Sequence, residues 1–366
     1  MHGKLDFALQ RFRVGGADVS YFDLTGQFPE GYASQRLQEF SAYYSNRMSY
    51  EEVEKLIERM TGQKLLSDQK LWQIVVEKAV QVSQPLREEV TAVVSTQPMP
   101  AVRGEVDLYD PDQPEVLLFD DAIQVKEQKP TRDQGTRPTG ASTPKARVST
   151  DVIMLEKADG GFHYLTAGID QQGEEIVPLE EVLRAKIIQE YGHTDDPLPL
   201  VAITDGAKAI RVRLVAIFGV AITLLLDWYH LGKRVTELMS MIARNKQERE
   251  CHLESLLGQL WRGRVSEALQ YLRTQVKAKN ATKLQDLIGY LEKHQGEIID
   301  YERRQRAGKP IGSGRMEKGV DQLIGARQKK KGMSWSRRGS KALAILKAVE
   351  LNNRWERLWF PQGVAA

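Results

Sequence analysis

The sequence predicts an α/β protein in which a mixed β-sheet carries helices on both faces, with a helical domain before the sheet and an all-helical insertion within it. Residues 115–129 are rich in β-forming residues and, from Phe119 onward, place alternate residues on one face, which is typical of a strand. Residues 198–204 and 221–226 are short apolar runs, as expected of strands buried on both faces. Residues 231–306 show helical periodicity without a strand signal, which predicts the insertion.

The N-terminal part of the chain is predicted to be an irregular arm, residues 1–31, followed by a helical domain, residues 32–84. Ser49 and Glu52 have the spacing of a capping box at a helix start, and Gly62 lies in a turn before the next helix. A helix, a glycine-containing turn and a helix resemble a helix-turn-helix DNA-binding unit. A plain helical bundle fits equally well, because the last of these helices carries few basic residues.

Residues 85–114 contain five prolines and are predicted to link this domain to the sheet, which occupies residues 115–230. Three strands form an antiparallel meander, and a helix, a strand, a second helix and a last strand follow. The predicted elements are strands at 115–129, 151–155 and 162–169, a helix at 177–191, a strand at 198–204, a helix at 207–218 and a strand at 221–226. This order matches the ribonuclease H-like fold, and in such open sheets sites form where strand ends meet.

The chain leaves the insertion through a glycine-rich turn and completes the core with residues 307–366, which include basic C-terminal helices. Pro310, Gly312 and Gly314 are unfavourable inside a helix and therefore mark a turn. Glu317 follows in the first turn of a helix, where the unpaired N–H groups favour a carboxylate. Taken alone it is an ordinary acid at a helix start, and it becomes a candidate metal ligand only if carboxylate partners exist elsewhere.

Two aspartates are such partners. Asp121 lies in the middle of the first strand, where a charge is costly unless it is paired or holds a metal, and Asp205 follows the fourth strand. Asp120 would point to the opposite face of the first strand. Carboxylate oxygens suit Mg²⁺ or Mn²⁺, and three carboxylates around two ions about 3.5–4 Å apart support in-line phosphoryl transfer. Asp121, Asp205 and Glu317 are therefore the candidate catalytic and metal-binding residues, although an ordinary turn also accounts for Asp205.

Composition and charge bound the class of protein. The 366-residue chain has no apolar run near the ~20 residues that a membrane span needs. Its single cysteine, Cys251, excludes a disulfide framework and a cysteine zinc site and favours the cytoplasm. Net charge is only +3, but residues 105–121 hold seven acids without Lys or Arg, whereas residues 326–349 hold eight Lys or Arg without an acid. This asymmetry favours a polyanion partner at the basic end.

Four blocks of the sequence together resemble a bacterial insertion-sequence transposase, closest to the DDE transposases related to the mutator-like group. The blocks are DAIQVKEQKPTR (121–132), AITDGAKAIR (202–211), LLLDWYHLGKRV (224–235) and SGRMEKGVDQLIGARQKKKGMSWS (313–336). The resemblance implies that Asp121, Asp205 and Glu317 are the catalytic acids of a ribonuclease H-like core. It also implies that the Asp-x-x-His signature of the group falls on Asp227 and His230, as accessory residues near the site.

Two features depart from that family. Ala122 stands where Gly is frequent, which is conservative in size. Extra N-terminal sequence with a cysteine zinc motif is not visible, so a shortened variant with impaired recognition of element ends is expected. From the residues alone, Asp227 orders the corner after the fifth strand, and His230 is either a structural histidine or a contact to DNA or to a metal-bound water.

The resemblance implies a DNA transposase that cuts the ends of an insertion sequence and joins the 3′-hydroxyls to target DNA, with two Mg²⁺ or Mn²⁺ ions. Its expected partners are double-stranded DNA of the terminal repeats and of the target, and further copies of the chain on that DNA, with no membrane. It would reside in the cytoplasm, at the nucleoid when bound to DNA. Two alternatives stay open: a catalytically silent or repurposed transposase that only binds DNA, and a structure-specific nuclease on the same fold.

Basic residues near the C-terminus are expected to contact DNA phosphates with little sequence readout. Trp335 is either a base-stacking residue or an anchor for the helix that follows it. The basic loop at 130–147 is expected either to close over DNA or to stay disordered, and Arg303, Arg304, Arg306 and Lys309 add charge before the glycine-rich turn. The predicted DNA contacts are Arg327, Lys329, Lys330, Lys331, Trp335, Arg337, Arg338 and Lys341.

Overall fold

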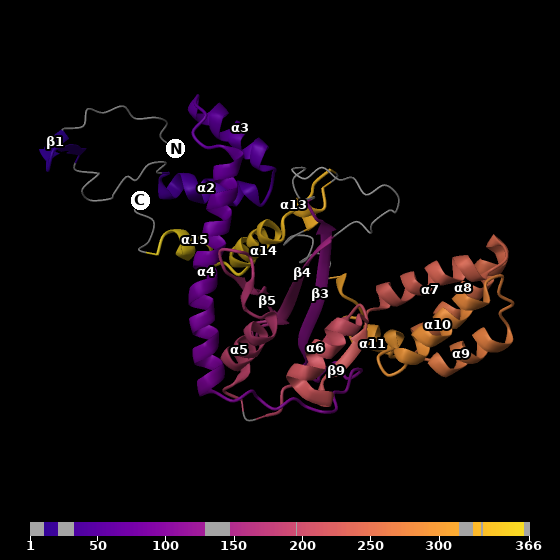
Figure 1. Cartoon of the computed structure of the whole chain (residues 1–366). Coiled ribbons are helices and arrows are strands. Elements are labelled where there is room, and N and C mark those ends of the chain that lie inside the picture. Colours follow the sequence, from indigo (N-terminus) through magenta and orange to yellow (C-terminus); the bar gives the residue numbers. More distant parts are fainter. Residues whose placement is uncertain are drawn as a thin grey trace.

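The structure is a computed structural model that describes residues 11–20, 33–128, 147–194, 196–314, 325–330 and 332–361 (Figure 1). Its centre is a five-stranded sheet with the order β5-β4-β3-β8-β9. β4 pairs antiparallel with β3 and β5, whereas β8 is parallel to β3 and to β9, so the predicted mixed sheet is confirmed. The strands are β3 (Val116–Lys126), β4 (Arg147–Glu156), β5 (Phe162–Leu165), β8 (Leu200–Thr204) and β9 (Thr223–Leu226).

The third predicted strand is shorter than its apolar pattern indicated. β5 ends at Leu165, and Gly168–Ile169 form β6, which pairs with β7 (Glu175–Val177) in a separate two-stranded sheet. The backbone N–H of Ile169 donates to the buried hydroxyl of Ser83 at 3.0 Å. Ser83 lies in a helix, and this contact holds the segment away from the main sheet. The local apolar pattern of the segment could not reveal it.

Helices cover both faces of the sheet. The face of β3 that carries Leu118 packs in one hydrophobic cluster with α5 and α6, and the face that carries Phe119 belongs to the cluster that includes α4 and α14. Because neighbouring side chains of a strand point to opposite faces, Asp120 and Asp121 are separated by the sheet. These helices are α4 (Asp68–Thr96), α5 (Leu179–Tyr191), α6 (Lys208–Phe218) and α14 (Arg337–Leu351).

Helix α4 corrects the predicted linker. It begins after its N-cap Ser67 and runs for 29 residues to Thr96, passing through Pro85, so residues 85–96 are helical rather than linking coil. Pro85 and Gln81, whose carbonyl loses its partner, are both exposed, and water can bond that carbonyl. Packing against α2, α5 and α14 holds the helix together on its buried side. Figure 1 shows α4 as one long helix that passes from α2 and α3 along the sheet.

The N-terminal helices are as their capping signals predicted. α2 (Gln35–Ser45) is followed by α3 (Tyr50–Thr61), in which Ser49 and Glu52 form the expected capping box. Gly62 ends α3 with φ +75°, a conformation that favours glycine. Buried residues of both helices belong to the same hydrophobic cluster as one face of the sheet, so these helices are packed onto the core.

Within the predicted arm, residues 11–20 form a hairpin, which corrects the expectation of irregular chain. β1 (Arg11–Val14) pairs antiparallel with β2 (Ala17–Ser20). Gly15 and Gly16 both have positive φ, as a two-residue hairpin turn of this type requires. The sequence signal was this pair of glycines between two short alternating stretches.

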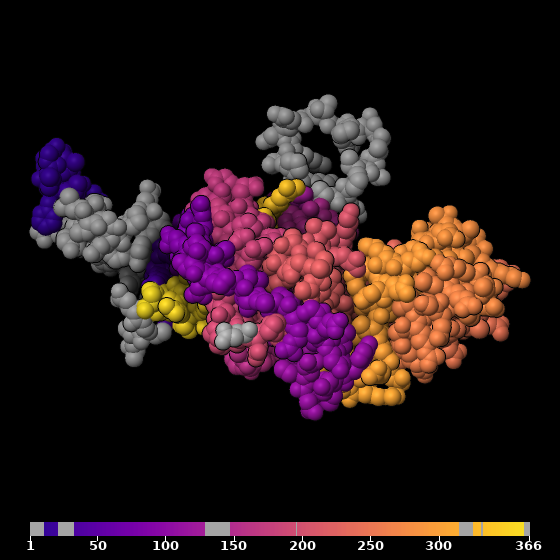
Figure 2. All heavy atoms as spheres, turned by 90° about the horizontal axis from the view of Figure 1, so that it is seen from below, coloured from indigo at the N-terminus to yellow at the C-terminus, as the bar shows by residue number. Residues whose placement is uncertain are grey.

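Residues after β9 form the predicted helical insertion. Its first four helices pack against one another in sequence, with α10 also packing on α7. Figure 2 shows the insertion as an orange lobe at one end of the molecule, opposite the yellow C-terminal helix. The helices are α7 (Trp228–Ile242), α8 (Lys246–Trp261), α9 (Val265–Thr274), α10 (Ala281–Lys293) and α11 (Tyr301–Arg306). The remaining short elements are η1 (Gly219–Ala221), α13 (Ala326–Gln328) and α15 (Trp355–Trp359).

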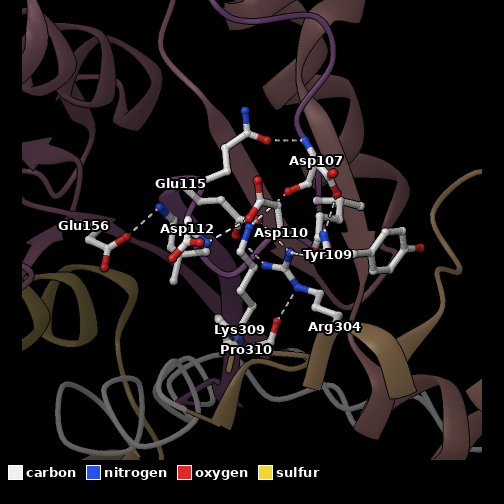
Figure 3. Close-up of polar contacts among 12 residues, drawn as sticks. Asp107, Tyr109, Asp110, Asp112, Glu115, Glu156, Arg304, Lys309 and Pro310 are labelled. Atoms are coloured by element: carbon white, nitrogen blue, oxygen red, sulfur yellow. Dashed lines mark hydrogen bonds and ion pairs between the residues drawn. The ribbon is translucent and has the colours of Figure 1, made fainter. Parts of the chain in front are cut away.

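A buried ion pair fastens the return of the insertion to the start of β3 (Figure 3). Arg304 on α11 is fully buried and donates from both terminal nitrogens to Glu115, at 2.9 and 2.7 Å. Its Nε donates to the carbonyl of Pro310 at 2.7 Å, and Lys309 donates to Glu115 at 2.8 Å. Two of the basic residues before the glycine-rich turn are thus committed to a buried carboxylate.

The other two basic residues before the turn are also engaged. The guanidinium of Arg303 lies 4.5 Å from the ring centroid of Tyr109, and Arg306 pairs with Glu302 at 3.0 Å. This basic group therefore serves local packing and ion pairing rather than forming a free positive surface. None of the helices in the described ranges is long and apolar enough to cross a membrane.

The Glu115 cluster gives a stability prediction. Replacing Glu115 with Gln leaves Arg304 buried without its counter-charge, so unfolding should cost about 3–5 kcal/mol less than in the parent protein. Glu292→Gln breaks an exposed pair with Arg273 and should change stability by less than about 1 kcal/mol. Urea unfolding of the three proteins measures this, and equal losses in both variants would contradict the importance given to burial.

Candidate active site

Asp121 and Asp205 lie one residue beyond the last pair of the parallel ladder between β3 and β8. β3 and β8 are in register up to the pair Asp120 and Thr204, so Asp121 and Asp205 are the next residues along each strand. Both are partly buried. Burial raises the pKa of the Asp121 carboxyl and the Asp205 carboxylate raises it further, whereas His230 and Lys329 lower it. The two predicted acids are therefore brought together in a pair whose charges repel.

Asp120 faces the opposite side of the sheet, as the strand alternation predicted. Its side chain is fully buried, and its Oδ2 lies 3.4 Å from Nε of Arg213 on α6. Burial raises the pKa of Asp120 to about 7, although Arg213 opposes this shift. Arg213 also pairs with Asp151 at 2.9 Å. Asp120 thus belongs to a separate charge cluster and does not face Asp205.

Asp227 is a structural anchor at the start of α7. It is fully buried and caps the helix, because its Oδ1 accepts from the backbone N–H of His230 at 2.8 Å. Its Oδ2 accepts from the backbone N–H of Ser313, in the glycine-rich turn. Burial raises the pKa of Asp227, but the hydrogen bonds from His230 and Ser313 outweigh this and lower it to about 2. Asp227 is therefore an ionised acceptor that fixes the turn.

His230 stands between this anchor and the two acids. Its Nδ1 lies 3.4 Å from Oδ1 of Asp227, and this carboxylate raises the pKa of the imidazole while burial opposes the shift. The charges of Asp205 and Asp121 act in the same direction as Asp227. His230 is thus part of the electrostatic environment of both acids, which favours the protonated form of its imidazole.

The glycine-rich turn is anchored beside the two acids. Pro310 accepts from Arg304, Ile311 accepts from the backbone N–H of Trp228 at 3.2 Å, and Ser313 donates to Asp227. Gly312 lies so close to Asp227 that an added Cβ would be 3.1 Å from Oδ2. Glu317 itself lies outside the described residues, as does the rest of 315–324.

The two aspartates fit a divalent cation chemically. Hard oxygen ligands are what Mg²⁺ and Mn²⁺ prefer, and a cation between Asp121 and Asp205 would relieve their repulsion. Among the residues that the structure describes, however, no group of three or more Asp, Glu, His or Cys side chains is close enough to hold a metal ion. Glu317, the third predicted ligand, lies in the 315–324 segment, outside the described residues.

Two predicted DNA contacts are buried and are corrected here. Arg327 is 3% exposed, donates to the carbonyl of Ser45 at 2.7 Å and lies 4.6 Å from the ring centroid of Trp335. Trp335 is 6% exposed and donates from its indole N–H to the carbonyl of Gln328 at 3.0 Å. Trp335 is thus an anchor for the chain before α14, and neither residue is free to contact a base or a phosphate.

Three further predicted contacts already have partners. Arg337 pairs with Glu127 at 3.1 Å, and Lys341 pairs with Glu175 at 3.0 Å. The guanidinium of Arg338 stacks over Trp72, 4.4 Å from the ring centroid. Their positive charge is therefore partly neutralised or shielded. Lys331 and nearly all of the predicted basic loop lie outside the described residues.

A basic groove adjoins the carboxylate pair. Lys126 and Arg147, at the ends of β3 and β4, and Lys329 and Lys330, after α13, line a cavity of about 420 Å³ without any acidic side chain. All four are exposed, and none forms an ion pair within the described part of the chain. Lys329 is close enough to Asp121 to lower its pKa. We call these four residues the basic groove.

The sequence prediction found only half of this groove. Lys329 and Lys330 stood out as part of a run of three lysines. Lys126 was missed because a single lysine at a strand end is unremarkable, and Arg147 was included only within the predicted basic loop, whereas it begins β4. Their pairing in register, Lys126 opposite Arg147, places both charges at one corner of the sheet.

Comparison with protein families gives one result. Residues 172–357 match the sequence model of an uncharacterised protein family. The matched segment includes Asp205, Asp227 and His230, as well as the segment that contains Glu317. No curated protein sequence matches the chain.

The environment of Asp227 gives a pH prediction. Its pKa is about 2 in the folded protein and near 4 when unfolded, so the ionised carboxylate stabilises the fold by about 2 kcal/mol above pH 4. This contribution is lost as the pH falls from 4 towards 2. Asp227→Asn removes the titration, and the stability gap between it and the parent should shrink over that range. Urea unfolding at pH 5, 3.5 and 2.5 measures the gap, with exposed Asp286→Asn as control; a constant gap for Asp227→Asn would refute the assignment.

Proposed function

This chain belongs to the uncharacterised protein family UPF0236, and we propose that it is a DNA transposase of an insertion sequence. In this proposal it cuts the ends of the element and joins the freed 3′-hydroxyls to target DNA. The core is ribonuclease H-like, Asp121, Asp205 and Glu317 are the metal ligands, and several copies of the chain assemble on the DNA. One observation carries the proposal: two repelling carboxylates, Asp121 within β3 and Asp205 directly after β8, lie one residue beyond the last pair of these parallel strands.

The strand order supports the ribonuclease H-like part of the proposal. An antiparallel β5-β4-β3 meander followed by parallel β8 and β9 places Asp121 on the central strand and Asp205 on its parallel neighbour. Acids at these positions are useful only where something compensates their repulsion. Divalent cations do so, and when bound they would polarise the phosphate and stabilise the attacking and leaving oxygens.

Residues of the chain would divide the remaining work. Asp227 and Trp228 hold the turn that leads to Glu317 at the start of α7, through bonds to Ser313 and Ile311. His230 contributes a positive charge that offsets part of their repulsion. The basic groove begins beside Asp121 and would bind the phosphates that flank the scissile bond. In this proposal the basic groove positions the substrate, and the three acids support the bond-breaking step.

The catalytic assignment predicts loss of both cleavage and strand joining. Asp205→Asn, Asp121→Asn and Glu317→Gln should each reduce the rate more than about 100-fold, because even partners outside a metal's ligand shell cost 10–100-fold. The assay uses labelled DNA that carries the element ends, with Mg²⁺ or Mn²⁺. Asp286→Asn, an exposed acid in the insertion, is the matched control.

Four outcomes are informative. Loss in all three variants with a joined product in the parent supports a transposase. Nicks without joined product in the parent would indicate a structure-specific nuclease, and metal-independent binding without any cleavage would indicate a DNA-binding protein. Full activity of Asp205→Asn or Glu317→Gln would refute the site.

The basic groove predicts a change in salt dependence. Each of Lys126→Ala, Arg147→Ala and Lys329→Ala should weaken binding to duplex DNA of any sequence and reduce the slope of log K against log salt by about 0.9. Lys341→Ala is the control, because Glu175 already neutralises this lysine. Fluorescence anisotropy between 50 and 200 mM salt measures the slopes. Equal slopes for Lys329→Ala and Lys341→Ala would show that DNA does not lie in the groove.

A further inference from the structure

The turn that carries Asp205 rests against a histidine of the helical insertion. Gly206, the next residue, has φ +80°, and an added Cβ would lie 2.9 Å from Cε1 of His294 and 2.8 Å from Cδ1 of Leu226. His294 follows α10 and is 1% exposed. A residue from the far end of the insertion thus forms one wall of the turn on which a predicted metal ligand stands.

His294 is held in place by a buried carboxylate. Its Nδ1 lies 2.6 Å from Oε2 of Glu297, which is 5% exposed, and the ring of Tyr290 packs at a centroid distance of 4.8 Å. Burial lowers the pKa of His294 to about 4, and the positive charges of Lys293 and Arg211 act in the same direction. Because a carboxylate accepts hydrogen bonds, the imidazole donates its Nδ1–H to Glu297.

Glu297 connects this histidine to the core on both sides of Asp205. Its carboxylate pairs with Arg211, which lies on α6, the helix that directly follows the Asp205 turn. Its backbone carbonyl accepts from the N–H of Leu226 at 2.9 Å, at the end of β9. His294 and Glu297 are thus tied to the helix after the turn, to the neighbouring strand and to the turn itself.

The Asp205 turn needs such support. Between β8 and α6 it has few bonds of its own: Asp205 accepts from the N–H of Ala207 at 2.7 Å, and Gly206 donates to the hydroxyl of Thr204 at 3.3 Å. A glycine at positive φ has wide conformational freedom. Metal ligands, in contrast, must be held within about 0.5 Å of their productive position.

We propose that His294, Glu297 and Arg211 form a positioning unit through which the helical insertion holds Asp205 in its metal-binding geometry. This inference rests on the proposed function, since it assumes that Asp205 is a metal ligand. It gives the insertion a role in the site although its residues do not themselves bind the metal. The sequence signal for this unit is the His-x-x-Glu spacing of residues 294 and 297, which places both side chains on one turn of chain.

Metal binding to the full-length protein without DNA tests the proposal. Mn²⁺ affinity, measured by electron paramagnetic resonance well below the melting temperature, should fall at least about tenfold in His294→Ala, as for other residues that orient ligands. Arg211→Ala, at a partly exposed position, should also lower the Mn²⁺ affinity, but by less than His294→Ala does. His252→Ala is the matched control, because His252 lies in the insertion and bonds only to Tyr271 among the described residues.

The outcomes separate this inference from the proposed function. If Asp205→Asn loses Mn²⁺ affinity while His294→Ala and Arg211→Ala bind as the parent does, the positioning unit is refuted and the proposed site stands. If Asp205→Asn binds Mn²⁺ normally, both are overturned. If His294→Ala does not fold, Arg211→Ala decides, because a purely structural role would lower its melting temperature and leave the affinity of the folded protein unchanged.

Discussion

The buried pair of Arg304 and Glu115 is the constraint on which the arrangement of the site depends. It joins residues 189 positions apart, at the end of the insertion and at the start of β3. The chain passes from Arg304 through only a few residues to the turn that bonds to Trp228 and Asp227. A bidentate pair in a fully buried position tolerates little displacement. The pair therefore fixes the position of the end of the insertion relative to the central strand, on which Asp121 lies.

The two neighbouring acids of β3 show how one strand can separate two electrostatic environments. Asp120 pairs with Arg213 on one face of the sheet. Asp121 is on the other face, near the like charge of Asp205, with His230 and Lys329 also nearby. Both carboxyls have raised pKa values for the same first reason, burial. Among the described residues Asp120 has an ion-pair partner, Arg213, whereas Asp121 has none, and this difference distinguishes a structural acid from a candidate ligand.

Much of the fold could be predicted because its signals are local. Strand alternation located β3, continuous apolar runs located β8 and β9, and the spacing of Ser49 and Glu52 located the start of α3. The two candidate acids were found for the same reason, since each lies at a recognisable position on its strand. What could not be predicted depends on contacts between distant segments.

Three errors have this origin. Pro85 was interpreted as a helix breaker, but packing of α4 against α2, α5 and α14 keeps the helix continuous. Arg304 and Lys309 read as free charge, because nothing in the sequence links them to Glu115. Arg327 and Trp335 were predicted to contact nucleic acid, whereas both are buried and pack on each other. In each case the residue type was interpreted reasonably, but the sequence does not show which distant segment the residue contacts.

The uninterrupted course of α4 has a consequence for how this chain can evolve. A helix advances about 1.5 Å and turns about 100° for each residue, so length and orientation are coupled. A single inserted or deleted residue between Leu71 and Val90 would swing α2 and α3 through more than a quarter turn relative to the sheet, whereas a change of seven residues would nearly restore their direction. Length variation in this part of the chain is therefore expected to occur in steps that match the helix repeat.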